Sequence, residues 1–172
     1  MRAVFLDRDG TIIEDMVYLS DPERLRFLKG AVEGLKRLYS AGYELFVVTN
    51  QSGLKRGFLS LERLLVIHRK LDLLLRREGI IVKKFAFCPH HPNERCRCRK
   101  PETFMVKRIL KEYPDIDLEE SYTVGDKYTD ILLGQKVGTK TILIGDRDAG
   151  KARPDYIARD LLQASEIILK KG

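Results

Sequence analysis

The chain has 172 residues, of which 44% are hydrophobic and 33% are charged. This length and composition predict one compact domain with a hydrophobic core and exclude a disordered or fibrous protein. Lys and Arg number 32 against 25 Asp and Glu, so the net charge is +7, which suits a phosphorylated small molecule, nucleic acid or an anionic membrane surface.

No segment contains the roughly 18 consecutive apolar residues that a membrane span requires, and Met1-Arg2 is not followed by a signal-type segment with a cleavage site. We therefore expect a cytoplasmic protein with no membrane partner, in which residues 1–172 form a single domain. All three cysteines lie between Cys88 and Cys98. Because an odd number cannot all pair within one chain, this clustering indicates a metal site rather than disulfides.

Short apolar runs that end at polar residues predict buried strands, and apolar residues at helical spacing predict the helices between them. In chain order we expect a strand at 3–6, a helix at 30–39, a strand at 45–48, a helix at 60–77, a strand at 83–87, an irregular loop at 88–101, a helix at 103–113, a strand at 122–124, a helix at 129–137, a strand at 141–144, a short edge strand at 155–158 and a helix at 160–170. This alternation predicts an α/β fold, a Rossmann-like parallel sheet with helices on both faces.

The 60–77 segment is the longest expected helix, with Ser60 as its N-cap. Its expected buried stripe consists of Leu61, Leu64, Leu65, His68, Leu71, Leu74 and Leu75. We interpret His68 as a partly buried helix residue rather than a metal ligand. The 12–29 connection is too short for a large inserted cap domain, so the ligand site is expected to be open.

Chemically active side chains follow the expected strands, where parallel α/β sheets bind ligands. Asp7 and Asp9 follow the first strand, and two carboxylates this close need a cation or a shared proton. The 49–53 segment, Thr-Asn-Gln-Ser-Gly, can cradle an anion, and Lys100 before Pro101 can present a charge to a phosphate. Asp126, at the end of a later strand, suits a hard divalent cation. Each motif alone is also compatible with an ordinary polar turn.

The Cys/His loop supplies three sulfurs and an imidazole in a Cys-x-His-x5-Cys-x-Cys pattern. This is the donor set of a closed, structural zinc site, which leaves no open position for a reacting water. Such a site would brace the irregular loop and position the two basic residues that follow its last cysteine. The alternative is three reduced cysteines near a chance histidine. The expected ligands are Cys88, His90, Cys96 and Cys98, with His91 as the rival to His90.

The four strand-end motifs occur in the order found in the haloacid-dehalogenase-like superfamily of phosphotransferases, which this sequence resembles. Within it, the strings at 7–12, 49–53, 88–92, 96–101 and 124–127 are similar to the D-glycero-D-manno-heptose 1,7-bisphosphate 7-phosphatases and the related histidinol-phosphate phosphatases. The resemblance extends from residue 3 to about residue 145. It favours His90 over His91 as the zinc ligand, and implies a magnesium-dependent phosphatase acting on a small phosphorylated sugar.

The resemblance also implies the roles of individual residues. Asp7 is the expected nucleophile, which forms an aspartyl-phosphate, and Asp9 is the general acid/base. Thr49 and Lys100 would stabilise the phosphoryl oxygens. Magnesium would be held by the carboxylates of Asp7 and Asp126 and by the backbone carbonyl of Asp9. The expected substrate contacts are Asp15, Tyr18, Asn50, Gln51, Ser52, Arg56, Arg99 and Lys127, although Arg56 is equally well interpreted as a solvated loop cation.

The sequence departs from the resembled family in the expected substrate loop, where Met16-Val17 replaces a common His-Gly, and at Thr103-Phe104, where Pro-Gly is common. Hydrolysis of histidinol phosphate is therefore the nearest alternative activity. Arg56 and Arg99 favour a bisphosphate, because its second phosphate needs a further cation. A zinc-braced nucleic-acid-binding module is a second alternative, but its acids would repel phosphates. A catalytically inactive relative is a third, which the complete set of acids disfavours. We expect a monomer with no nucleic-acid partner.

Overall fold

The computed structural model describes residues 1–147 and 149–172. Six parallel strands form one sheet in the order β3-β2-β1-β4-β5-β6. The strands are β1 (Arg2–Leu6), β2 (Tyr43–Asn50), β3 (Val82–Cys88), β4 (Tyr122–Gly125), β5 (Lys140–Ile144) and β6 (Tyr156–Ala158). The helices are α1 (Ala31–Ser40), α2 (Leu61–Arg77), α3 (Phe104–Glu112), α4 (Tyr128–Val137) and α5 (Leu161–Lys171), with short 3-10 helices η1 (Pro22–Arg24) and η2 (Pro92–Glu94). The expected α/β class and element order are confirmed, with boundaries shifted by one or two residues.

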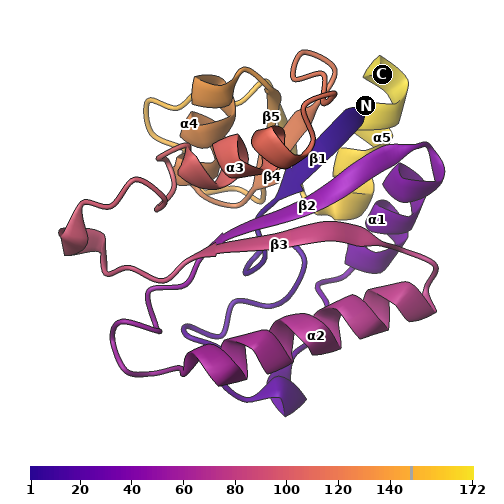
Figure 1. Ribbon diagram of the computed structural model, residues 1–172. Coiled ribbons are helices and arrows are strands. Elements are labelled where there is room, and N and C mark those ends of the chain that lie inside the picture. Colours follow the sequence, from indigo (N-terminus) through magenta and orange to yellow (C-terminus); the bar gives the residue numbers. More distant parts are fainter. Residues whose placement is uncertain (148) are drawn as a thin grey trace.

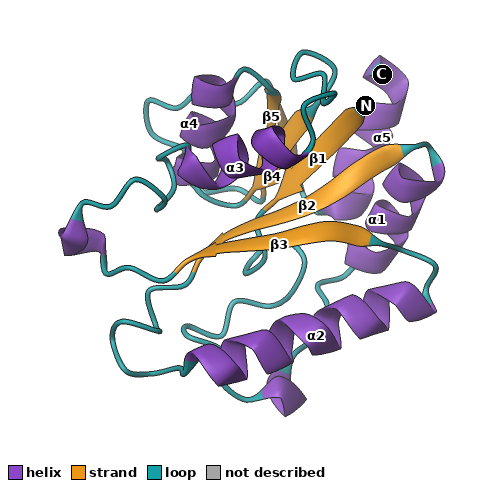
Figure 2. Cartoon of the chain, viewed as in Figure 1, coloured by secondary structure: helices purple, strands orange, loops and turns teal. Residues whose placement is uncertain are grey.

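Helices cover both faces of the sheet (Figures 1 and 2). Alternate residues of a strand point to opposite faces, and β1 shows this directly. Its Val4 and Leu6 belong to a core cluster shared with α1, α2 and α5, whereas Ala3 and Phe5 belong to a second cluster under α3 and α4. Burial on both faces explains why the strands read as continuous apolar runs.

The expected stripe of α2 is partly wrong. Ser60 does cap the helix, since its Oγ accepts a hydrogen bond from the Arg63 backbone N–H at 3.1 Å. However, Leu61 and Leu65 are each 52% exposed, and Ile67 is buried instead. The buried positions are Leu64, Ile67, His68, Leu71 and Leu75, which form a narrower stripe of i, i+3 and i+4 neighbours. Because α2 is rich in leucine, the apolar stripe expected from the sequence is wider than the face of the helix that is buried against the sheet.

The connection between β1 and α1 contains, as regular structure within residues 7–30, only η1 and two isolated bridges. This agrees with the expectation of no large cap domain. The irregular loop after β3 extends well beyond the sheet and carries η2 (Figure 1). Among the described residues, no helix is both long and apolar enough to cross a membrane.

Candidate active site

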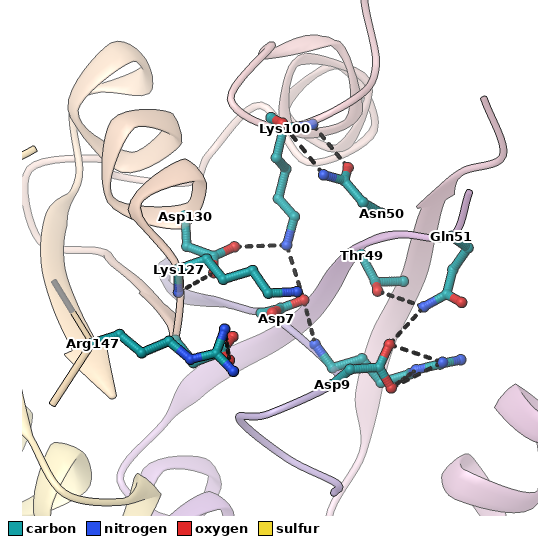
Figure 3. Close-up of polar contacts among 11 residues, drawn as sticks. Asp7, Asp9, Thr49, Asn50, Gln51, Lys100, Lys127, Asp130 and Arg147 are labelled. Carbon is teal, nitrogen blue, oxygen red and sulfur yellow. Dashed lines mark hydrogen bonds and ion pairs between the residues drawn. The ribbon is translucent and has the colours of Figure 1, made fainter. Parts of the chain in front are cut away.

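The predicted catalytic side chains meet at the carboxyl ends of the strands. Asp7 follows β1, Thr49 lies near the end of β2, and Asp126 follows β4. Because β1 is central, with β2 on one side and β4 on the other, the order of the sheet places these three strand ends side by side. Lys100 reaches the same point from the loop after β3 (Figure 3).

Lys100 is the positive centre of this group, with a side chain that is 3% exposed. Its Nζ donates to Asp7 Oδ1 at 2.9 Å and to Asp130 Oδ1 at 2.6 Å. Asn50 fixes the lysine backbone from two directions, since its Oδ1 accepts from the Lys100 N–H at 2.9 Å and its Nδ2 donates to the Lys100 carbonyl at 3.3 Å. Asn50, predicted as a substrate contact, therefore also positions Lys100.

The pKa values of the buried groups follow from this arrangement. Burial alone would raise the pKa of the Asp7 carboxyl, but the Lys100 ammonium outweighs it and the pKa is lowered. Burial and the charge of Asp7 raise the pKa of Asp126 to about 7 and that of Asp130 to about 6. Burial would lower the pKa of Lys100, but the charges of Asp130 and Asp7 raise it. Asp7 is thus an anionic carboxylate beside a fixed cation, as a nucleophile for a phosphate ester requires.

Carboxylate oxygens of Asp7, Asp126 and Asp130 lie within 4.8 Å of one another, close enough to share a cation. Asp126 Oδ1 is buried without a hydrogen-bond partner among the described residues, which is costly unless something binds it. Gly10 has φ +79°, and a Cβ added there would lie 2.2 Å from Asp126 Oδ2, so glycine is needed for this approach. Oxygen donors of this kind fit Mg²⁺.

Asp9 points away from this carboxylate cluster and is bound by other groups. The Arg8 guanidinium donates from Nε to Oδ1 and from Nη2 to Oδ2, both at 3.0 Å. Gln51 Nε2 also donates to Asp9 Oδ2 at 3.0 Å, and to Thr49 Oγ1 at 2.9 Å. Burial raises the pKa of Asp9, and Arg8 opposes this effect. A carboxyl with a raised pKa suits a group that must carry a proton in one step and accept it in the next.

An open pocket of about 1030 Å³ lies over these residues. Among residues 1–147 and 149–172, seven of those that line the pocket are basic and three are acidic, so the pocket suits an anion with more than one negative group. All eight predicted substrate contacts line it, namely Asp15, Tyr18, Asn50, Gln51, Ser52, Arg56, Arg99 and Lys127. The Lys127 side chain extends toward Asp7 (Figure 3).

One wall of the pocket is made by two loops that contact each other. Tyr18 stacks on Phe58 with ring centroids 5.0 Å apart, and the Arg56 guanidinium lies 5.6 Å from the Tyr18 ring. Arg56 Nε also donates to Ser52 Oγ at 3.2 Å. Val17 and Tyr18 have φ of 46° and 63°, which is unfavourable for a β-branched or bulky residue. The packing of Tyr18 against Phe58 and Arg56 holds the backbone in this conformation.

The four predicted zinc ligands converge on one point of the loop after β3. The Sγ atoms of Cys88, Cys96 and Cys98 lie 2.9 to 3.7 Å apart, and His90 Nδ1 lies 3.1 Å from Cys98 Sγ. His91 is directed elsewhere, because its Nδ1 accepts from the Asn93 backbone N–H at 3.1 Å and begins η2. Burial raises the pKa of Cys96, but the backbone N–H groups of Arg99 and Cys98 outweigh it and bring the pKa to about 7. Three sulfurs and one imidazole nitrogen fit Zn²⁺.

Several residues of the site were not predicted from the sequence. Asp130 was given no role, although it is buried and binds Lys100. Its position on the first turn of α4, four residues after Asp126, was the available signal, since that spacing turns a side chain back toward the strand end. Nothing in the sequence pattern distinguished the basic pocket residues Arg95, Arg97 and Arg147 from other surface cations.

Comparison with known proteins shows where these features recur. The family model of HAD-hydrolase-like proteins matches residues 97–164. The D-glycero-beta-D-manno-heptose-1,7-bisphosphate 7-phosphatase of Pasteurella multocida is 34% identical, over 97% of this chain and 96% of that protein. The protein of the same name from Helicobacter pylori strain 26695 is 40% identical, over 83% of each chain.

Solved structures agree with the sequence relatives. The crystal structure of D,D-heptose 1,7-bisphosphate phosphatase from B. bronchiseptica, complexed with magnesium and phosphate, superimposes with a TM-score of 0.91, 30% identity and full coverage of both chains. A HAD-like phosphatase from Mesorhizobium loti gives a TM-score of 0.84 at 30% identity, over 98% of this chain and 87% of that one. The expected family is thereby confirmed, and the chain belongs to the heptose-bisphosphate phosphatase family of the HAD-like hydrolases.

Proposed function

We propose that this chain is a magnesium-dependent phosphatase that removes the 7-phosphate from D-glycero-D-manno-heptose 1,7-bisphosphate through an aspartyl-phosphate on Asp7. The observation that carries the proposal is the buried Asp7 carboxylate, fixed by Lys100 beside a pocket with a large excess of basic residues. The names of the relatives and the structure containing magnesium and phosphate support the reaction and the substrate class.

The residues perform the reaction in two displacements. An oxygen of Asp7 bonds to phosphorus as the ester P–O bond breaks, and the proton of Asp9 passes to the leaving alcohol oxygen. In the second displacement Asp9 takes a proton from water as the water oxygen bonds to phosphorus, and Asp7 is released. Lys100 and Thr49 hold phosphoryl oxygens while charge develops on them. The residues that would hold Mg²⁺ are Asp7, Asp126 and the Asp9 carbonyl, and the ion would offset repulsion between the nucleophile and the phosphate.

The excess of basic residues in the pocket favours a bisphosphate over histidinol phosphate. Cations of the loop after β3 and of the 53–58 loop line the pocket together with Lys100, and a second phosphate would need such additional cations. Histidinol phosphate carries an amine and an imidazole instead, which acidic groups would favour, and among the described lining residues the acidic ones number three against seven basic ones. The test is kcat/KM for the heptose bisphosphate and for histidinol phosphate with Mg²⁺ present. Higher kcat/KM for the bisphosphate is expected, and efficient turnover of histidinol phosphate alone contradicts the substrate assignment.

The Cys/His cluster is proposed to bind a structural Zn²⁺ through Cys88, His90, Cys96 and Cys98. All four donors come from the protein, so the ion would brace the loop and take no part in the reaction. Bracing matters because Arg99 and Lys100 directly follow the last ligand. The remaining expectations, a monomeric cytoplasmic enzyme of one domain with no nucleic-acid or membrane partner, stand as parts of the same proposal, and sedimentation of the purified protein tests its oligomeric state.

A further inference from the structure

Arg8 has no role in the reaction described above, yet it is among the largest side chains that are completely buried. A buried guanidinium is costly unless its N–H groups are paired. Two of its nitrogens bind the two oxygens of Asp9, and the third, Nη1, lies 3.0 Å from His68 Nε2. Arg8 therefore joins the carboxyl group proposed as the acid/base to a side chain on α2.

His68 can take only one form in this contact. Arginine has no acceptor, so Nε2 must accept the hydrogen bond and the ring must be neutral with its proton on Nδ1. Burial, followed by the charge of Arg8, lowers the pKa of His68 to about 3, in agreement with that form. The ring stacks on Phe85 at 5.1 Å and meets the edge of Phe87 at 6.2 Å, both on β3. His68 is thus a fixed acceptor with little freedom to move.

We propose that Arg8 and His68 are positioning residues for Asp9, with His68 fixing the Arg8 guanidinium and Arg8 fixing the plane of the Asp9 carboxyl group. The inference rests on the proposed function, because it concerns the residue that exchanges a proton with the leaving oxygen and with the attacking water. Arg8 binds both carboxyl oxygens, so it restricts rotation of Asp9 in a way that the single bond from Gln51 does not. A misdirected acid/base group slows proton transfer more than it weakens substrate binding.

The test uses His68→Phe, which keeps an aromatic ring against β3 but removes the acceptor. Formation of the phosphoenzyme is measured by rapid quench with two esters, an alkyl phosphate and p-nitrophenyl phosphate. The alkyl leaving group needs a proton from Asp9, whereas nitrophenolate leaves without one. With the alkyl ester we expect a rate about 10- to 100-fold below wild type, and with the aryl ester a rate within about threefold of it.

Two further variants separate positioning from packing. His68→Gln places an amide oxygen near the position of Nε2 and is expected to restore the alkyl rate to within about threefold of wild type. Leu71→Ala, one turn along the buried face of α2, removes packing but no hydrogen bond to Arg8, and both rates are expected to stay near wild type. If His68→Phe fails to fold, Arg8→Lys carries the same test, because lysine cannot bind both Asp9 oxygens and His68 together.

The possible failures are distinguishable. Absence of hydrolysis of the heptose bisphosphate by the wild-type protein with Mg²⁺ present contradicts the proposed function, whatever the protein does with the two esters. If it hydrolyses both, and His68→Phe or Arg8→Lys slows neither ester or slows both equally, the positioning role fails while the proposed function stands. If His68→Gln slows the alkyl ester as much as His68→Phe does, the inference is also contradicted, because the hydrogen-bond acceptor for Arg8 would then make no difference to the rate.

Discussion

The two clusters of potential metal ligands are built on different parts of the fold. The carboxylates of Asp7, Asp126 and Asp130 are buried at the ends of β1 and β4 and on the first turn of α4, and Lys100 pairs with two of them. In the Cys/His cluster, Cys88 is the last residue of β3 and is buried in the core under α3 and α4, whereas His90, Cys96 and Cys98 lie on the projecting loop. The sheet therefore orients the first cluster, whereas in the second it orients only Cys88, and the three ligands on the loop depend on the metal for a fixed arrangement.

This difference predicts opposite consequences for the two clusters. Changes among the carboxylates should affect turnover strongly and stability little. Changes among the cysteines should affect stability first, and turnover only through the position of Arg99 and Lys100.

Asp7→Asn should abolish turnover while leaving the fold intact. The amide cannot form the aspartyl-phosphate, and we expect kcat to fall by at least about 10³-fold. Lys100 keeps Asp130 as a partner, so the buried ammonium stays paired. Steady-state hydrolysis measures the loss, and circular dichroism with thermal unfolding checks the fold. Near-normal activity in this variant contradicts the mechanism.

Asp126→Asn should weaken magnesium binding without affecting zinc. The neutral amide is a poorer ligand for Mg²⁺ than a carboxylate, so at low magnesium we expect activity about 10- to 100-fold below wild type, partly recovered by excess magnesium. Magnesium titrations of activity measure this change, and elemental analysis for zinc is the control. An unchanged magnesium dependence would remove Asp126 from the proposed site.

Cys96→Ser should affect zinc binding and stability more than turnover. Loss of one thiolate from a four-ligand site is expected to release the zinc and lower the melting temperature by at least about 5 °C. Activity should fall less than in Asp7→Asn, and bound zinc is measured on the same sample. A variant that keeps both its zinc and its melting temperature would show that the cluster is not a structural metal site.

The last prediction concerns stability at acid pH. The pKa of His68 is about 3 in the folded protein and near 6.5 when unfolded, so the unfolded chain binds the extra proton first. Folding stability from this group is complete above about pH 6.5 and is lost toward pH 3, by about 1.4 kcal/mol for each pH unit. His68→Phe should lack this loss.

Denaturant unfolding of wild type and His68→Phe at pH 7 and pH 4.5 measures the difference. Asp126 and Asp130, whose pKa values are raised, act with the opposite sign over these pH values and are common to both proteins. The comparison between the two proteins therefore isolates His68. Parallel stability curves would show that burial and the charge of Arg8 do not lower the pKa of His68 in the folded protein.

The α/β class, the order of the helices and strands, and the catalytic residues that follow the strand ends were predictable from the sequence. The strands of a parallel sheet are buried on both faces, so β1 and β5 read as short apolar runs, and the end of β1 marked the position of Asp7. The width of the α2 stripe was not predictable in the same way, because leucine at Leu61 and Leu65 has the same identity whether it faces the sheet or solvent. The sequence pattern shows which residues are apolar. Which face of the helix is buried depends on the elements that pack against it in the folded protein.

The same limit applies to the site. Asp9 and Lys100 belong to short motifs after strand ends and could be singled out. The contact between Arg8 and His68 joins residues 60 positions apart, and neither carries a local signal for the other. A histidine on a leucine-rich helix face is compatible with simple packing, and only the tertiary structure brings its Nε2 to the guanidinium.

The proposed mechanism requires that Asp7 becomes covalently phosphorylated. This is tested by acid quench of Asp9→Asn during its reaction with p-nitrophenyl phosphate and Mg²⁺, followed by mass spectrometry of the peptide containing Asp7. Nitrophenolate leaves without a proton from Asp9, whereas loss of the base slows breakdown of the phosphoenzyme. We expect a phosphoryl group on Asp7, absent from Asp7→Asn treated in the same way. Turnover by the wild-type protein with no phosphoryl group on Asp7 in any quenched sample would contradict the mechanism.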